Sequence, residues 1–167
     1  IYLRWSDFDA DGADDGLAID DFSLSFTNPA PTPVGGIFES YAIINKAGNT
    51  IYYDLKEEVV TNTNDFQGTN LGTYNNTGTL LLKGAENKTN KCSPTDITNG
   101  TLYYRVYPEN GTPGSFQTMN LPFAENNISG PGCENQKWAQ TNANENLVSG
   151  LCNGTYTLEV YTAANYQ

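Results

Sequence analysis

The sequence predicts an all-β protein, an antiparallel β-sandwich of the Ig-like or jelly-roll-like kind, preceded by part of another β domain. Apolar and polar residues alternate in several short runs, and a period of two places the two sets on opposite faces of a strand. Asn, Gly, Thr and Pro separate these runs, which is typical of strands joined by polar turns. The Ala-, Leu-, Glu- and Lys-rich runs that long helices need are missing.

The clearest strand is Thr101–Tyr107, which begins a predicted hairpin. Leu102, Tyr104 and Val106 share one face of it, which we expect to point inward. The outward face carries Tyr103, Arg105 and Tyr107. The segment Pro108–Gly114 supplies the Pro, Asn and Gly residues that reverse a chain. Ser115–Phe123 is therefore predicted to return beside the first strand.

From Ile37 onward, the sequence predicts short strands separated by turn-rich segments, the pattern of an antiparallel sandwich. The strands are Phe38–Asn45, Thr50–Leu55, Gly78–Lys83, Thr101–Tyr107, Phe116–Phe123 and Thr155–Tyr161. In the last of these, the inward face carries Tyr156, Leu158 and Val160, and Tyr161 lies on the outward face. Two long polar segments, Asn64–Tyr74 and Asn126–Asn146, are interpreted as loops, where recognition residues tend to lie.

The domain organisation follows from residues 28–36, whose prolines and glycines indicate a linker. Residues 1–27 are interpreted as the C-terminal strands of a preceding jelly-roll-like domain, because two strands and a loop cannot bury a core alone. The alternative is that the following domain borrows them. Residues 37–167 are predicted to form the sandwich module without its last strand. We also expect a fragment of a longer precursor whose targeting segment lies elsewhere.

Composition excludes several classes of function. The chain has eight Lys and Arg against nineteen Asp and Glu, a net charge of −11, and no His. Such an acidic surface repels nucleic acid and anionic lipid, and it keeps an extracellular protein soluble. Without His, a Ser-His-Asp or Cys-His arrangement is impossible within this sequence. No apolar run is long enough to span a bilayer, so we expect no membrane insertion.

An acidic loop near the N-terminus is the candidate metal site. Its run Asp7-Phe8-Asp9-Ala10-Asp11-Gly12 opens like a calcium loop, but Ala18 stands where an EF-hand has its bidentate Glu, which excludes an EF-hand. A structural Ca²⁺ in a different site is one interpretation, and a solvated acidic turn is the other. A glycosidase pair of carboxylates is disfavoured in so exposed a loop. The candidate ligands are Asp7, Asp9, Asp11, Asp14, Asp15, Asp20 and Asp21.

Aromatic residues are the candidate glycan-binding residues. Tyr103 and Tyr107 lie on the predicted outward face, and Trp138 is expected in a loop. Planar rings beside polar side chains can stack on sugar rings. The alternative is that these rings pack in a second layer or cover a sheet edge.

The three cysteines, Cys92, Cys133 and Cys152, lie in polar turn segments without a C-x-x-C spacing. A disulfide formed in an oxidising compartment fits them better than a zinc site. Their spacing leaves all three pairings open. The N-x-[ST] sequons indicate exposed turns; they are at Asn75, Asn87, Asn99, Asn110, Asn127 and Asn153.

Several segments resemble known secreted modules. Leu3–Asp7 and Asp14–Ser23 resemble the closing strands of MAM-like or lectin-like jelly-roll domains in secreted proteins of Bacteroidetes-type bacteria. The segments similar to a module that often follows are Leu102–Tyr107, Asn120–Phe123, Gln136–Trp138, Leu147–Leu151 and Gly154–Tyr161. Such modules accompany surface adhesins or secreted hydrolases exported by the type IX route, and the family has no catalytic residues. The resemblance implies that Cys152 pairs beyond Gln167, which leaves Cys92 to pair with Cys133.

These observations predict a non-catalytic structural or adhesive module of a larger bacterial surface or secreted protein. We expect it outside the cell or on the outer cell surface, with other domains or subunits of an extracellular assembly as partners. The first alternative is a carbohydrate-binding module. The second is an accessory region of a secreted nuclease or other hydrolase whose active site lies outside these residues.

Overall fold

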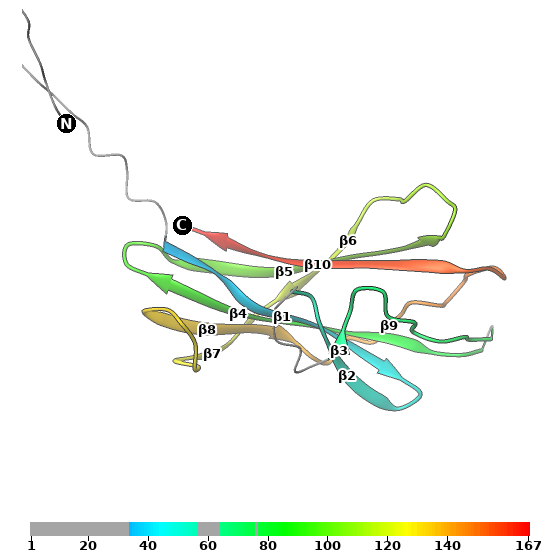
Figure 1. Ribbon diagram of the computed structural model, residues 1–167, viewed down its shortest axis with the longest axis horizontal. Coiled ribbons are helices and arrows are strands. Elements are labelled where there is room, and N and C mark those ends of the chain that lie inside the picture. Colours follow the sequence, from blue (N-terminus) through cyan, green and yellow to red (C-terminus); the bar gives the residue numbers. More distant parts are fainter. Residues whose placement is uncertain (1–33, 57–63, 76) are drawn as a thin grey trace, which may run out of the picture. The chain divides into compact units, whose positions relative to one another are not determined.

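Two β-sheets stacked as layers make up the described part of the chain (Figure 1). The computed structural model describes residues 34–56, 64–75 and 77–167, which lie within one compact unit, Pro33–Gln167. These described residues form ten strands and no helix, which confirms the all-β class and the sandwich. Residues 1–27, assigned above to a preceding β domain, lie outside the described residues.

The larger sheet has the strand order β3-β2-β1-β4-β8-β7, with β9 paired to β4. Its strands are β1 (Val34–Lys46), β2 (Asn49–Asp54), β3 (Asn64–Asp65), β4 (Leu80–Cys92), β7 (Phe123–Asn126), β8 (Glu134–Gln140) and β9 (Glu145–Asn146). The smaller sheet has the order β10-β5-β6 and consists of β5 (Ile97–Pro108), β6 (Gln117–Leu121) and β10 (Tyr156–Tyr166). Among the described strands, β2 and β3 run parallel and the other pairs are antiparallel.

The predicted hairpin is confirmed as β5 and β6, which pair from Gly100↔Leu121 to Tyr104↔Gln117. The predicted inward face is confirmed as well, because Leu102 is fully buried and Tyr104 is 7% exposed. Both sheets contribute apolar side chains to one core between them. Its buried members include Ile44, Leu82, Ala85, Leu102, Tyr104, Leu121 and Trp138.

The chain crosses between the layers at Pro122. Leu121 ends β6 in the smaller sheet, and Phe123 begins β7 in the larger one. The prediction of one strand over Phe116–Phe123 was therefore wrong. Proline has no N–H to donate to a ladder, and its carbonyl instead accepts a hydrogen bond from the backbone N–H of Ala139 in β8, at 2.9 Å.

Strand β4 is much longer than the predicted Gly78–Lys83. It continues to Cys92 because polar side chains take inward positions: Asn87 and Thr89 are completely buried. Ser40 donates a hydrogen bond of 2.9 Å to the Asn87 side-chain carbonyl. Because these inward positions are polar, the alternation of apolar and polar residues does not indicate this part of the strand. Gly84, at φ +130°, marks the bulge between the two halves of β4.

Two other boundaries differ from the expectation. Strand β1 begins at Val34, inside the segment interpreted as a linker, and Gly35 pairs with Lys91. A side chain at Gly35 would place its Cβ 2.7 Å from the carbonyl oxygen of Asn90, so glycine permits this close approach. The segment Asn126–Asn146, expected to be a loop, contains β8 and β9.

Candidate functional site

The outward face of the smaller sheet carries a group of aromatic and charged side chains, here called the aromatic face. It consists of Tyr103, Arg105 and Tyr107 of β5, Phe116 before β6, and Glu159 and Tyr161 of β10. Tyr103 lies directly opposite Tyr161 in the ladder, and Arg105 lies opposite Glu159. Directly opposed residues point to the same side of a sheet, so alternation placed these residues correctly.

The rings of Tyr103 and Tyr161 stack with their centroids 4.6 Å apart and their planes 4° from parallel. Phe116 meets the Tyr161 ring edge to face at 5.0 Å. Part of this surface stays open to solvent, since Tyr161 is 43% exposed.

Arg105 links the charged and aromatic parts of the face. Its Nε donates a 2.8 Å hydrogen bond to Glu159 Oε2, and Nη1 donates to the Gly114 carbonyl at 3.0 Å. The guanidinium carbon lies 4.0 Å from the centroid of the Phe116 ring, within the range of a cation–π interaction. Exposed rings with hydrogen-bonding groups held beside them can stack on a planar or sugar-like ligand.

Trp138 does not belong to this face, and its assignment as a glycan-binding loop residue was wrong. It lies in β8, is 7% exposed, and packs in the core with the Phe123 ring at 5.5 Å. Its indole N–H is buried without a hydrogen-bond partner. A ring enclosed between two sheets cannot stack on a sugar.

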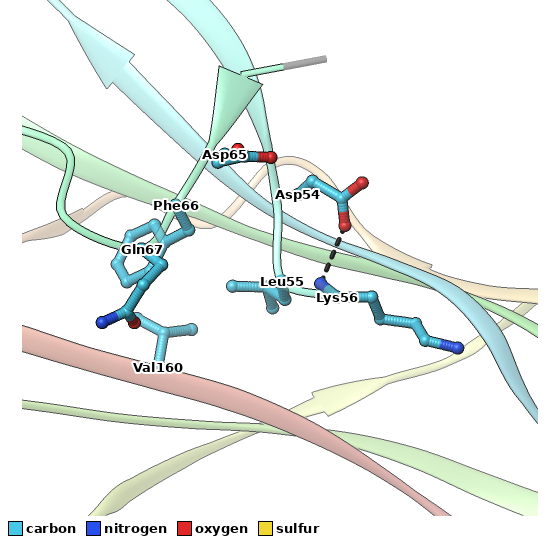
Figure 2. Close-up of a pocket in the computed structure, with 7 residues that line it drawn as sticks. All are labelled: Asp54, Leu55, Lys56, Asp65, Phe66, Gln67 and Val160. Atoms are coloured by element: carbon cyan, nitrogen blue, oxygen red, sulfur yellow. Dashed lines mark hydrogen bonds between the residues drawn. The ribbon is translucent and has the colours of Figure 1, made fainter. Parts of the chain in front are cut away.

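A cavity of about 700 Å³ opens between β10 and the β2–β3 end of the larger sheet. Figure 2 shows Val160 of β10 pointing towards Gln67 and Phe66, with Leu55 between the two layers. Its lining residues are Asp54, Leu55, Lys56, Asp65, Phe66, Gln67 and Val160. The cavity was not predicted, although Phe66 and Gln67 belong to the segment Asn64–Tyr74 in which recognition was expected.

Charged groups at the cavity are partly engaged. Asp54 and Asp65 pair in the ladder of β2 and β3, and Asp54 Oδ1 accepts a 2.8 Å hydrogen bond from the backbone N–H of Lys56. The Lys56 ammonium donates to the carbonyls of Ile37 and Phe38, at 3.0 and 3.3 Å. The lining therefore combines the apolar side chains of Leu55, Phe66 and Val160 with charged ones. A smaller groove of about 170 Å³ adjoins it, lined by Ile37, Ser40, Leu55, Lys56, Tyr161 and Thr162.

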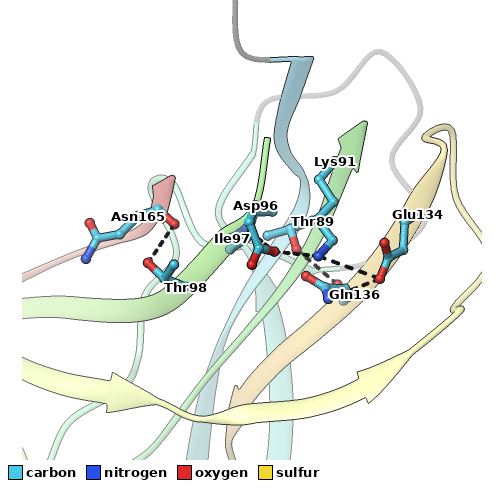
Figure 3. A network of polar contacts seen from close by, with 8 residues as sticks. All are labelled: Thr89, Lys91, Asp96, Ile97, Thr98, Glu134, Gln136 and Asn165. Atoms are coloured by element: carbon cyan, nitrogen blue, oxygen red, sulfur yellow. Dashed lines mark hydrogen bonds and ion pairs between the residues drawn. The ribbon is translucent and has the colours of Figure 1, made fainter. Parts of the chain in front are cut away.

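The far end of β4 is joined covalently to the chain before β8. Cys92 and Cys133 form a disulfide with Cα atoms 5.1 Å apart, the pairing that the resemblance implied, and Cys152 is free and exposed. Next to Cys92 of the disulfide, Lys91 forms ion pairs with Asp96 and Glu134 (Figure 3). The hydrogen bond from Lys91, followed by one from the Ile97 backbone N–H, lowers the pKa of Asp96 below its ordinary value. The same contact with Asp96 raises the pKa of Lys91.

The predicted calcium ligands, Asp7, Asp9, Asp11, Asp14, Asp15, Asp20 and Asp21, lie outside the described residues, so a Ca²⁺ site there stays a prediction. Within residues 34–56, 64–75 and 77–167, no three or more His, Cys, Asp or Glu side chains gather as metal ligands would. The same residues contain no helix of the length and hydrophobicity that crossing a membrane requires.

No family model, no curated protein and no solved structure matches this chain.

Proposed function

We propose that this chain is a non-catalytic adhesive module of a larger bacterial surface or secreted protein. The observation that carries the proposal is the aromatic face, which presents the exposed Tyr161 ring beside the half-buried rings of Tyr103 and Tyr107 on two paired strands. Tyr103 and Tyr161 are fixed by their mutual stacking, and Arg105 is held by Glu159. Rings held rigidly in this way lose little conformational entropy on binding, which favours adhesion.

The positions of the start of β1 and the end of β10 support an adhesive role over that of an in-line spacer. The start of β1 and the end of β10 lie side by side: a Cβ at Gly35 would be 3.2 Å from the Tyr166 ring. The start of β1 and the end of β10 therefore lie at the same end of the sandwich (Figure 1). If neighbouring domains attach at this end, the module would project from its parent protein instead of extending it.

Two further properties support an extracellular setting. A disulfide between Cys92 and Cys133 persists best in an oxidising compartment. A net charge of −11 keeps an exposed protein soluble and apart from anionic surfaces.

A carbohydrate is the second candidate, as the ligand of the same face. The observation that favours it is the combination of an exposed Tyr161 ring, 43% accessible, with the Arg105–Glu159 ion pair beside it. Sugar rings offer an apolar face for stacking and hydroxyls for charged groups. With Trp138 buried, the residues that would bind the sugar are Tyr103, Tyr107 and Tyr161.

Retention of the purified chain on immobilised glycans, insoluble polysaccharides and extracellular matrix proteins tests both candidates. Tyr161→Ser should weaken retention roughly fivefold, because a ring contact contributes about 1 kcal/mol. The matched control is Tyr52→Ser, since Tyr52 is 42% exposed on a strand of the other sheet. We expect it to bind as the parent does.

Competition by soluble oligosaccharides separates a sugar ligand from a protein ligand. If the parent chain is retained on none of these surfaces, or if Tyr52→Ser weakens retention as much as Tyr161→Ser, adhesion through the aromatic face is refuted.

A further inference from the structure

The unpaired edge of β10 and the groove beside it point to a second binding site, which adjoins the aromatic face at Tyr161. We infer that this edge accepts an extended strand from a different polypeptide, one with alternating apolar and basic residues. In this mode, called β-strand addition, backbone hydrogen bonds supply affinity and pockets for alternate side chains supply specificity.

Hydrogen bonds at its two ends show which residues of β10 turn away from β5. The Glu109 N–H donates to the Thr155 carbonyl at 3.0 Å, and Asp96 and Gln167 exchange two bonds of 2.9 Å. Hydrogen-bonded pairs alternate along an antiparallel ladder, so the odd-numbered residues of β10 bond to β5. The even-numbered residues turn their N–H and C=O groups away from it: Tyr156, Leu158, Val160, Thr162, Ala164 and Tyr166.

Among the described strands, none pairs with this outer edge of β10. Proteins commonly protect such an edge with Pro, Lys or an inward-pointing charge. Strand β10 has none of these, and Glu159, its one charged residue, points outward and pairs with Arg105. The edge is thus a row of backbone donors and acceptors left suitable for another strand.

A groove runs beside the same edge. Val160 lines the 700 Å³ cavity, and Tyr161 and Thr162 line the smaller groove. Leu55 and Lys56 line both, so the two hollows adjoin each other beside β10; Figure 2 shows the larger one. Val160 packs against the core but is only partly buried. A strand added to the edge would place every second side chain in this groove, where an apolar residue would cover Val160.

Charge selects the kind of strand. Asp54 and Asp65 lie at the cavity, and the chain carries a net charge of −11. Lys56, the basic residue of the groove, already donates to two carbonyls of β1. A strand with basic residues would be attracted to this acidic chain, whereas a second copy of the chain would be repelled.

The test uses the full chain and a labelled, end-capped peptide that alternates Val with Lys and Thr. Two N-methylated versions serve as probes, one methylated at every Val and the other at every Lys and Thr. In an added strand, only one of these two sets of N–H groups faces β10. We expect one version to lose binding and the other to keep it.

Hydrogen exchange locates the peptide. Protection should rise about tenfold or more at the amides of Leu158, Val160, Thr162 and Ala164, which gain a partner only in the complex. The odd-numbered amides of β10 are already bonded to β5 and should change little.

A charge placed in the groove should block the site. Val160→Lys is expected to weaken peptide binding about tenfold, because it sets a charge where an apolar side chain must enter. Tyr52→Lys adds the same charge at an exposed position of β2 in the other sheet and should bind as the parent does. If Val160→Lys fails to fold, the two methylated peptides still decide the question.

The inference is overturned if no peptide binds, if both methylated versions bind equally, or if protection arises away from β10. Concentration-dependent dimerisation that protects the same four amides would assign the edge to a second copy and refute the choice of partner.

Discussion

The two flanks of the sandwich differ in how the sheets meet. At the β6–β8 flank, here called the closed flank, the chain itself crosses between the layers at Pro122, and Leu121 is completely buried. A Cβ at Gly100 would lie 3.1 Å from both Leu121 and Trp138, so backbone and side chains meet closely there. At the β2–β10 flank, here called the open flank, no described strand crosses between the layers, and Val160 borders a cavity of about 700 Å³.

We expect the closed flank to contribute more to the stability of the fold, and the open flank to be available for binding. The closed flank contains the sheet crossing and includes β8, and the disulfide joins Cys92 at the end of β4 to Cys133 just before β8. At the open flank, the outer edge of β10 has no pairing partner among the described strands, and the side chain of Val160 is only partly buried. Because the closed flank buries Leu121 and Trp138, we expect the fold to tolerate incomplete burial at the open flank.

The largest expected effect comes from the disulfide. The variant Cys92→Ser with Cys133→Ser should lose about 4 kcal/mol in free energy of unfolding, because the bond closes a loop of 41 positions. Urea unfolding monitored by tyrosine fluorescence measures this. Cys152→Ser is the control, since that thiol is free and exposed, and its effect should stay within about 0.5 kcal/mol. If the two changes lowered the free energy of unfolding equally, the stabilising role assigned to the disulfide would be contradicted.

A pair of core truncations compares the flanks directly. Leu121→Ala should cost about 3 kcal/mol, since it leaves a cavity among fully buried neighbours. Val160→Ala should cost about 1 kcal/mol or less, because its side chain is only partly buried. Both values come from the same urea titrations. If the valine change costs as much as the leucine change, the open flank is as well packed as the closed one.

The smallest effect concerns Lys91, beside the disulfide, and it depends on pH. Because the pKa of Asp96 is lowered in the folded state, its carboxylate contributes its full stabilisation above pH 3.8. This contribution to the free energy of unfolding is lost as pH falls through the folded-state pKa. Because the pKa of Lys91 is raised in the folded state, its ammonium contributes its full stabilisation of the fold below pH 10.5. This contribution is lost as pH rises through the folded-state pKa. Lys91→Gln should therefore lower the urea midpoint slightly at pH 7, and less at either extreme.

Lys46→Gln removes the same charge from a lysine whose ammonium contacts a backbone carbonyl, that of Asn70, at 3.5 Å. Its effect should not follow the titration of Asp96. A Lys91→Gln deficit that stays constant from acid to alkaline pH would show that the ion pair with Asp96 contributes nothing.

The sequence predicted the smaller sheet well and the larger sheet poorly, for one physical reason. In β5 and β10 the inward residues include Leu102, Tyr104 and Val160, so alternation is visible. In β4 and β8 the buried residues include Asn87, Thr89 and Gln136, and a polar interior gives no such pattern. Only tertiary partners, such as Ser40 for Asn87, make these positions suitable for burial.

The candidate sites divide in the same way. Alternation placed Tyr103, Arg105 and Tyr107 on one outward face, but it could not show that Tyr161 stacks on Tyr103. Trp138 was misplaced because its strand was read as a loop. The cavity had no signal beyond the polar segment Asn64–Tyr74, since Asp54 and Val160 meet there only through the packing of two sheets.

The sequence by itself determined the all-β class, the β5–β6 hairpin and the outward ring face, because these follow from local alternation and turn residues. Tertiary structure alone decided which strands form each sheet, where Pro122 switches layers, and which flank stays open. Those features depend on contacts between residues far apart in the chain, and a repeat of two residues carries no information about them.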